Sequence, residues 1–178
     1  FADQAVSNTT ASPNGWHNAS TTIGGTTAAS MYTYLRGNNV WARSDYSGTA
    51  ASSTTHSTTS TANGYSPTNA GLIYDFPYPG TMVAANSYID AATTNLFYMN
   101  NICHDIWYQY GFNEANKNFQ RNNYGRGGAG NDYVFANAQD GSTATTPTLN
   151  NANFLAPTDG TSGQMRMYLW SYRKTTQL

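Results

Sequence analysis

Residues 88–110 read YIDAATTNLFYMNNICHDIWYQY, and this stretch decides the architecture. Apolar side chains recur along it in steps of three and four residues, which is the periodicity of one helix face. The members of this stripe are Ile89, Ala92, Leu96, Met99, Cys103, Ile106 and Tyr110. Ser87 with Asp90 predicts a capping box at the start, and Gly111 predicts a left-handed cap at the end. We therefore expect one scaffold helix over about 88–110, roughly 33–35 Å long, with the stripe in the core.

The segments on either side of this helix indicate loops and short strands. Residues 1–86 are mostly small and polar, and residues 47–64 within them predict a long exposed loop. Residues 119–178 begin with a glycine-rich loop and continue with strand patterns. The segments expected to be extended are 31–42 (strand, turn, strand), 72–79 (a proline-interrupted edge), 132–138, 150–155 and 165–172. The prediction is a single α+β domain over 1–178, a β-rich lobe with one long helix.

Composition excludes several classes of function. Only 10% of the 178 residues are charged, Lys and Arg number 8, and the formal net charge is −1. Because nucleic-acid binders neutralise phosphates with Lys and Arg, we expect no nucleic-acid partner. No apolar run is long enough to cross a bilayer, so we expect no membrane partner. Glu114 is the only glutamate, which excludes a mechanism based on paired glutamates, and the single Cys103 excludes an intrachain disulfide.

The surface chemistry is typical of a secreted protein. Thr, Ser, Asn and Gly stand where charged residues are usual, and a neutral surface rich in Thr, Asn and Tyr suits a β-rich secreted protein. Asn8-Thr9-Thr10 and Asn18-Ala19-Ser20 are acceptor sequons for N-linked glycans. We therefore expect secretion, with Asn8 and Asn18 as candidate glycosylation sites.

The histidines do not form a metal site by spacing. His17, His56 and His104 are too far apart in sequence for the paired spacing of zinc ligands, so we expect this chain to bind no zinc. His104 lies in a row with Asn100 and Tyr108 on the predicted helix. Two interpretations remain open at this point: a polar row that faces a cleft, or a buried histidine held by hydrogen bonds.

Two other sequence patterns are only weak indications of a ligand site. The glycines at 125, 127 and 130 have the spacing of a dinucleotide fingerprint, but they follow a helix and precede a strand, so they predict a turn. Turn aspartates could offer oxygens to calcium, or could serve only as turn residues. These aspartates are Asp132, Asp140 and Asp159. Without a nucleophile motif such as G-x-S-x-G, the residues alone present no complete reaction centre.

Three long motifs, in order, resemble one known family. They are NLFYMNNICHDIWYQYGFNEANKNFQ from Asn95, GRGGAGNDYVFANAQDG from Gly125 and NNANFLAPTDGTSGQMRMYLW from Asn150. Earlier pieces fit too: ASPNGWHN (11–18), YLRGNNVWA (34–42) and YDFPY (74–78). The chain resembles the catalytic domain of the fungalysins, which are secreted fungal zinc metalloendopeptidases of the thermolysin-like fold.

The resemblance implies a zinc enzyme whose zinc motif is absent from this chain. In the family, H-E-x-x-H lies on a helix that follows the strand resembling MRMYLW, whereas the sequence here continues as RKTTQL. We therefore expect the N-terminal lobe of such an enzyme, inactive by itself, or a shortened relative. A non-catalytic secreted binding protein, either sugar-binding or a pseudo-enzyme, is the alternative.

The resemblance also implies a substrate-binding edge and a partner. Residues 150–154 resemble the edge strand that binds peptide or protein substrates by strand addition. By that match, the Asn151 amide and the Ala152 carbonyl hold the substrate and Phe154 helps to wall the cleft. Without the zinc helix, an apolar face stays uncovered, and we expect it to include some of Met165, Met167, Leu169 and Trp170 or the stripe that contains Cys103. We expect that face to bind the remaining C-terminal protease segment or a second copy of the chain.

Overall fold

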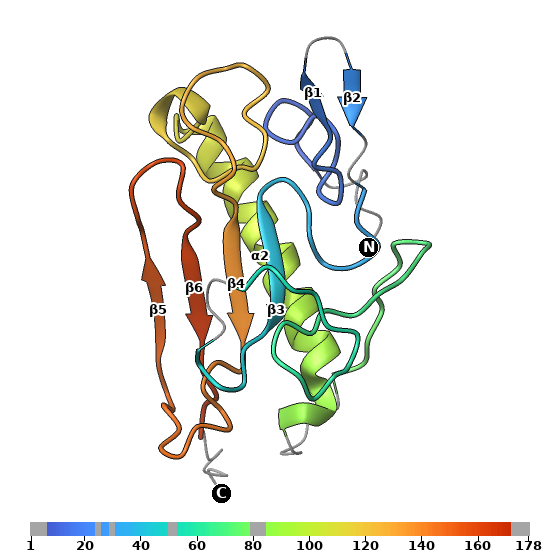
Figure 1. Ribbon diagram of the computed structural model, residues 1–178, viewed down its shortest axis with the longest axis vertical. Coiled ribbons are helices and arrows are strands. Elements are labelled where there is room, and N and C mark those ends of the chain that lie inside the picture. The colour runs from blue at the N-terminus through green and yellow to red at the C-terminus, as the bar shows by residue number, and fades with distance from the viewer. Residues whose placement is uncertain (1–6, 24–25, 29–30, 50–52, 79–84, 172–178) are drawn as a thin grey trace, which may run out of the picture.

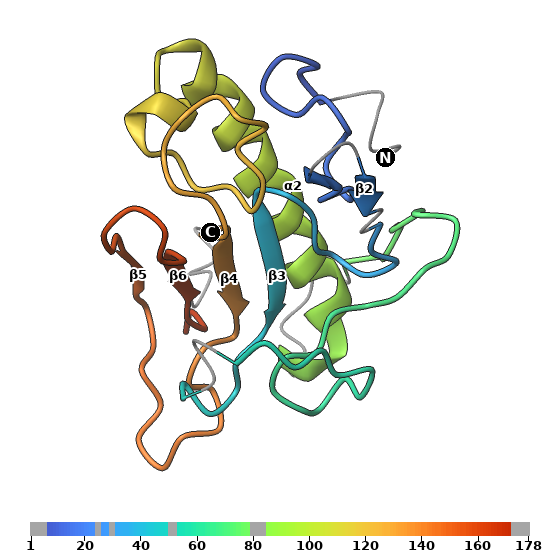
Figure 2. The ribbon, with the colours of Figure 1, turned by 45° about the horizontal axis from the view of Figure 1, so that its top comes forward.

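Figures 1 and 2 show a long helix packed against a sheet in the computed structural model, and this sheet has four strands. The structure describes residues 7–23, 26–28, 31–49, 53–78 and 85–171. Its elements are β1 (Thr21–Ile23), β2 (Thr26–Ala28), β3 (Val40–Ser44), η1 (Ala85–Tyr88), α2 (Ile89–Gln109), η2 (Glu114–Asn116), β4 (Val134–Ala138), β5 (Ala152–Leu155) and β6 (Gln164–Met167). The expected α+β lobe with one long scaffold helix is confirmed.

The main sheet is mixed and has the strand order β3–β4–β6–β5. β3 pairs in parallel with β4, and β4 pairs in parallel with β6, whereas β5 runs antiparallel to β6. β1 and β2 form a separate antiparallel pair. β5 therefore lies at an outer edge of the sheet, next to a single neighbour.

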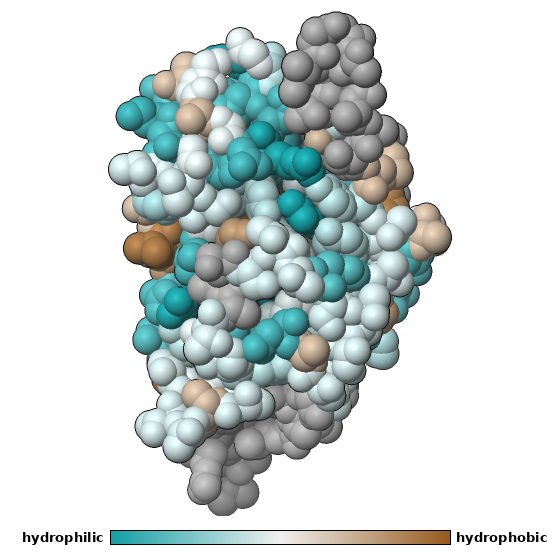
Figure 3. Space-filling model, viewed as in Figure 1, coloured by the Kyte–Doolittle hydropathy of each residue, from teal (hydrophilic) through white to brown (hydrophobic). Residues whose placement is uncertain are grey.

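The two faces of the sheet have different partners. Successive residues of a strand point to opposite faces, so the small apolar residues of β3 and β4 all face α2. These residues join Phe97 of α2 in the main core, which contains Trp16, Leu35, Val40, Ala42, Tyr74, Phe97, Val134 and Ala136. The other face buries an aromatic cluster of Trp41, Tyr133 and Phe135. Figure 3 shows that the molecular surface on this second side is mainly hydrophilic.

The predicted helix is present, but the predicted buried stripe is wrong in its second half. Met99 and Ile106 are each 45% exposed, and Cys103 and Tyr110 are also exposed. The buried residues of α2 are Ile89, Thr93, Thr94, Phe97, Asn101 and Asp105. Thr93 and Asn101 can be buried because each bonds the helix backbone, to the carbonyls of Ile89 and Phe97, both at 2.8 Å. The spacing of apolar residues in the sequence does not show which polar side chains are buried with their hydrogen bonds made to the helix backbone.

Of the two caps predicted for the helix, the N-terminal one is wrong and the C-terminal one is confirmed. Ser87 lies in η1, Tyr88 occupies the N-cap position, and no side chain caps the helix there, so the predicted capping box is wrong. The Asp90 carboxylate instead accepts a hydrogen bond from the Tyr65 hydroxyl at 2.6 Å. At the other end, Gly111 has a φ of +98°, and the predicted left-handed cap is confirmed.

The predicted strands are present mainly in the second half of the chain. β4, β5 and β6 lie within or beside the predicted segments 132–138, 150–155 and 165–172. Residues 31–39 form only isolated bridges before β3 begins, and residues 72–78 form no strand although Tyr74 is buried. The described part of the 47–64 loop is mainly exposed, as predicted. Residues 50–52, Pro79 and the stretch from Tyr172 onward lie outside the described residues.

The glycine-rich loop packs closely onto η2, the short helix that follows α2. A Cβ atom on Gly128 would lie 2.1 Å from the Glu114 carbonyl oxygen, and Gly128 has a φ of +62°. The close contact and the positive φ both require glycine at position 128, so this part of the loop is tightly packed.

Among the residues that the structure describes, no helix is long and apolar enough to cross a membrane.

Candidate functional site

β5 is an exposed strand that, among the described residues, pairs on one side only, with β6. Figure 1 shows it at the outer edge of the sheet, beyond β6. All four of its residues are exposed. An edge strand of this kind offers a row of free backbone donors and acceptors to another extended chain.

The register tells which backbone groups of β5 are free. The Tyr168 N–H donates to the Asn151 carbonyl at 3.3 Å, so Asn151 faces β6. In an antiparallel pair the residues alternate between bonding the neighbour and pointing away from it. Asn153 therefore also faces β6, whereas Ala152 and Phe154 direct their backbone groups to the open side.

The bonding of β6 supports this assignment. Met167, which lies opposite Ala152, accepts a hydrogen bond from the Asp140 N–H at 3.1 Å and so faces β4. The Ala152 N–H is already occupied, because it donates to the Asn151 side-chain oxygen at 2.8 Å. The Ala152 carbonyl is thus the acceptor directed to the open edge, and the Asn151 side chain lies beside it.

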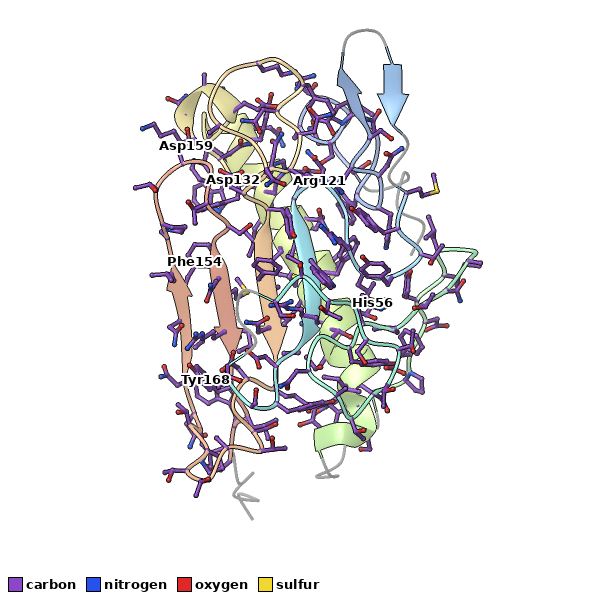
Figure 4. All side chains as sticks on the ribbon, in the orientation of Figure 1. His56, Arg121, Asp132, Phe154, Asp159 and Tyr168 are labelled. Carbon is purple, nitrogen blue, oxygen red and sulfur yellow. The ribbon has the colours of Figure 1, made fainter. Side chains whose placement is uncertain are left out.

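Phe154 walls a pocket between the edge strand and α2. Phe154, labelled in Figure 4, is 43% exposed. Its ring packs edge-on against Phe119 with the ring centres 5.5 Å apart. Gly163 lies against it, because a Cβ there would lie 2.7 Å from the Phe154 ring and the ring would have to shift. The pocket measures about 320 Å³ and is lined by Asn39, Asn100, Cys103, His104, Trp107, Phe112, Phe119, Val134 and Phe154.

His104 lines this pocket but is held by hydrogen bonds on both sides. Its Nδ1 lies 2.9 Å from Asp105 and its Nε2 lies 2.9 Å from the Gln120 side-chain oxygen. The Asp105 carboxylate also accepts from the Ser12 hydroxyl at 2.7 Å and the Trp16 indole at 3.0 Å. Burial alone would raise the pKa of Asp105, but these hydrogen bonds outweigh it and lower the pKa. The interpretation of His104 as a buried, hydrogen-bonded histidine is the one that these contacts favour.

The same network contains a residue that the sequence analysis did not single out as a site. Glu114 is buried and accepts a hydrogen bond from the Tyr108 hydroxyl at 2.8 Å. It also accepts from Gln120 at 3.3 Å and lies 3.4 Å from Arg126 Nη1. The sequence contains one indication of this: Glu114 is the only glutamate of a chain with few charged residues, and such a carboxylate is a candidate for a buried, hydrogen-bonded position.

The candidate calcium ligands do not converge. Asp132 and Asp159 lie near one end of the sheet, as Figure 4 shows, whereas Asp140 follows the opposite end of β4. Both oxygens of Asp132 accept backbone N–H groups, from Gln120 at 2.9 Å and Gly160 at 3.0 Å. In the described residues, no three His, Cys, Asp or Glu side chains form a group that could hold a metal ion.

The other two histidines take part in aromatic stacking. His17 lies against the Tyr74 and Phe97 rings, with ring centres 5.3 and 4.4 Å away, and His56 stacks on Tyr34 at 3.8 Å. Each of the three histidines therefore has its own separate surroundings.

A long helix under a mixed sheet with an open antiparallel edge is the N-terminal lobe architecture of thermolysin-like metallopeptidases. The comparison of sequences then specifies the family. The model of the fungalysin metallopeptidase family (M36) matches residues 2–177, and the chain belongs to this family. The resemblance identified from its motifs is confirmed.

Several fungal relatives are similar over most of the chain. It is 45% identical over 158 residues to "Extracellular metalloproteinase MEP" of Pyricularia oryzae, which covers 88% of this chain and 23% of that protein. It is 45% identical over 143 residues to "Extracellular metalloproteinase 5" of Trichophyton rubrum, covering 80% and 20%. With "Extracellular metalloproteinase 1" of Arthroderma otae it shares 51% over 109 residues, covering 61% and 16%. The chain thus spans about a fifth of the length of these relatives.

Proposed function

We propose that this chain is the N-terminal lobe of the catalytic domain of an extracellular zinc metalloendopeptidase. Its membership of the M36 family and the names of its relatives support this function. Because the chain spans about a fifth of those relatives, the activity belongs to a longer protein of which this lobe is a part.

The zinc ligands are proposed to lie outside the residues described here. A catalytic zinc needs three protein ligands converging on one point. The described histidines and carboxylates do not fit that requirement, since His104 and Asp105 are committed to one hydrogen-bonded network and Asp132 to backbone donors. Bound zinc would supply an activated water and polarise the scissile carbonyl in the complete enzyme.

The open edge of β5 is the observation that carries the substrate-binding role. We propose that an extended peptide pairs with β5, and that its N–H donates to the Ala152 carbonyl. The Asn151 amide is placed next to that carbonyl and can bond the substrate backbone. The exposed Phe154 ring then packs against a substrate side chain at the mouth of the 320 Å³ pocket.

The exposed apolar face of α2 is proposed to bind the zinc-bearing segment of the same protease. Its members are Met99, Ile106, Trp107, Tyr110 and Phe112. So many large exposed apolar side chains on one helix and its following turn indicate a covering partner. The length of the relatives beyond this match supplies such a segment. Self-association of the isolated lobe is the other outcome, and sedimentation of the lobe with and without that segment separates the two.

The test uses the protease that carries this lobe, with Asn151→Ala and the matched variant Asn153→Ala. Asn153 lies in β5, two residues after Asn151, but its side chain bonds the Tyr168 hydroxyl at 3.1 Å. Loss of a substrate hydrogen bond should lower kcat/KM on peptides by about three- to tenfold for Asn151→Ala, with a change under about twofold for Asn153→Ala. Equal losses of kcat/KM in both variants would contradict the proposed binding of substrate along β5. A zinc-loaded protease that cleaves no protein would overturn the proposed activity and favour a pseudo-enzyme.

A further inference from the structure

The first sequon, Asn8-Thr9-Thr10, lies in a turn whose backbone is fixed from three sides. The Asn8 N–H donates to Asp105 of α2 at 2.8 Å. The Asn8 carbonyl accepts from the Ser12 N–H at 2.7 Å. The Thr10 carbonyl accepts from Arg126 Nη1 at 2.8 Å. This turn is thus joined to both the long helix and the glycine-rich loop.

Toward the described residues, the Asn8 side chain uses only its oxygen. Its Oδ1 accepts the N–H groups of Thr10 at 2.9 Å and Ala11 at 3.1 Å, which closes the turn. Its Nδ2 donates to no group among the residues with described positions. Thr9 and Thr10 are both exposed, so a large group on Asn8 would have solvent beside it.

The second sequon has different surroundings. Asn18 Oδ1 accepts both the N–H and the hydroxyl of Ser20, so the hydroxyl that completes the sequon is engaged. Ala19 is fully buried and Ser20 is buried. The Ser20 carbonyl accepts a hydrogen bond from Asn122 at 2.5 Å, which ties this segment to the glycine-rich loop. A glycan on Asn18 would therefore have to leave a closely packed part of the lobe.

We propose that Asn8 carries an N-linked glycan in the folded protein and that Asn18 does not. The donor is an oligosaccharide on a lipid diphosphate. A bond forms between Asn8 Nδ2 and C1 of the first sugar, while the bond between C1 and the phosphate oxygen breaks. The lipid diphosphate leaves with the electron pair, and the amide loses one proton to a base. The proposal requires the secretory route that the proposed function implies.

The fold selects between the two sequons because attachment precedes complete folding. A chain modified at Asn8 can still form its turn, since the bonds of Asn8 use Oδ1 and the backbone. A chain modified at Asn18 would have to bury Ala19 and Ser20 beside the first sugar. The folded, secreted population is therefore expected to carry the glycan on Asn8 alone.

The experiment expresses the protease that carries this lobe in a fungal secretory host. Enzymatic removal of N-glycans in heavy-oxygen water converts each modified asparagine to a labelled aspartate, which peptide mass spectrometry locates. We expect the label at Asn8 and none at Asn18. The variant Thr10→Ala, which destroys the sequon but keeps the Asn8 side chain and the Thr10 carbonyl, should abolish it. Thr10→Ser should keep it.

The controls separate this proposal from the proposed function. Asn18→Gln should leave the glycan mass of the lobe unchanged. Label at Asn18, or an unmodified Asn8 in secreted protein, would overturn the proposal. Proteolysis is measured on the same samples, so an active but unglycosylated protease would refute the glycan site and leave the proposed function standing.

Discussion

Asp140 is the residue whose ionisation should most visibly change the stability of the lobe. It follows β4 and is 1% exposed, and Asp45, which follows the parallel strand β3, is also buried. Burial and the charge of Asp45 raise the pKa of Asp140 to about 6, although Arg166 Nε at 3.9 Å opposes them. The folded lobe therefore holds a proton on Asp140 that the unfolded chain has already lost at mildly acidic pH.

The sign and size of the effect follow from this difference in pKa. Between about pH 4 and pH 6 the folded state binds more protons than the unfolded state, so the free energy of unfolding falls as the pH rises. Above about pH 6, Asp140 is ionised in both states, and the folded state carries the full free-energy cost of the buried carboxylate. A pKa about two above the ordinary value corresponds to about 3 kcal/mol. Asp140→Asn removes the charge and keeps the shape, so it should stabilise the lobe by about 1–3 kcal/mol at pH 8 and by nearly nothing at pH 4.

The assay is urea unfolding of the purified chain from pH 4 to pH 8, followed by tryptophan fluorescence. Asp75→Asn is the matched control, because Asp75 is exposed. The gain from Asp140→Asn should grow as the pH rises through 4 to 6, whereas the control should stay flat. A gain that is equal at both ends, or a loss at pH 8, would show that the carboxylate is not penalised in the fold.

The same urea assay tests four further substitutions. Phe97→Ala should cost about 3–5 kcal/mol because its ring is fully buried, while Met99→Ala should cost under about 1 kcal/mol; similar losses would mean that the buried face is misplaced. Gly128→Ala should cost at least about 1 kcal/mol through its positive φ and its clash with the Glu114 carbonyl, and an unchanged midpoint would contradict that packing. Asp105→Asn should cost about 1.5–3 kcal/mol at pH 7. Since hydrogen bonding lowers the pKa of Asp105, that loss should shrink as the pH falls below about 4, and a pH-independent loss would refute its charge-assisted role.

The existence of α2 could be predicted, but the side it buries could not. The three- and four-residue period and Gly111 located the helix and its end correctly. Its buried face depends on Thr93 and Asn101 bonding their own helix backbone, and a pattern of apolar residues contains no such information. Helix capping failed for a related reason, since Asp90 bonds Tyr65, which lies far away in sequence.

The candidate site was predictable only in part. A family motif pointed to residues 150–154, and the structure places Phe154 on an edge strand with an open side. The backbone direction of Ala152 depends on the register with β6, which only the fold reveals. The position of Glu114 in the network of His104 likewise depends on contacts between separate segments of the chain.

The parallel pairing of β3 with β4 has a consequence for how the lobe folds. Arg43 and Asn137, paired in register across these strands, are separated by 94 residues in sequence. Closing so large a loop loses chain entropy before any strand contact forms, and topologies dominated by such contacts fold in milliseconds to seconds, about a thousandfold slower than helical bundles. The central ladder cannot begin until residue 134 has left the ribosome, and it gains its third strand only with β6. During synthesis, α2 is therefore complete while its apolar side has no sheet to cover it, and the nascent lobe is exposed to aggregation for that interval.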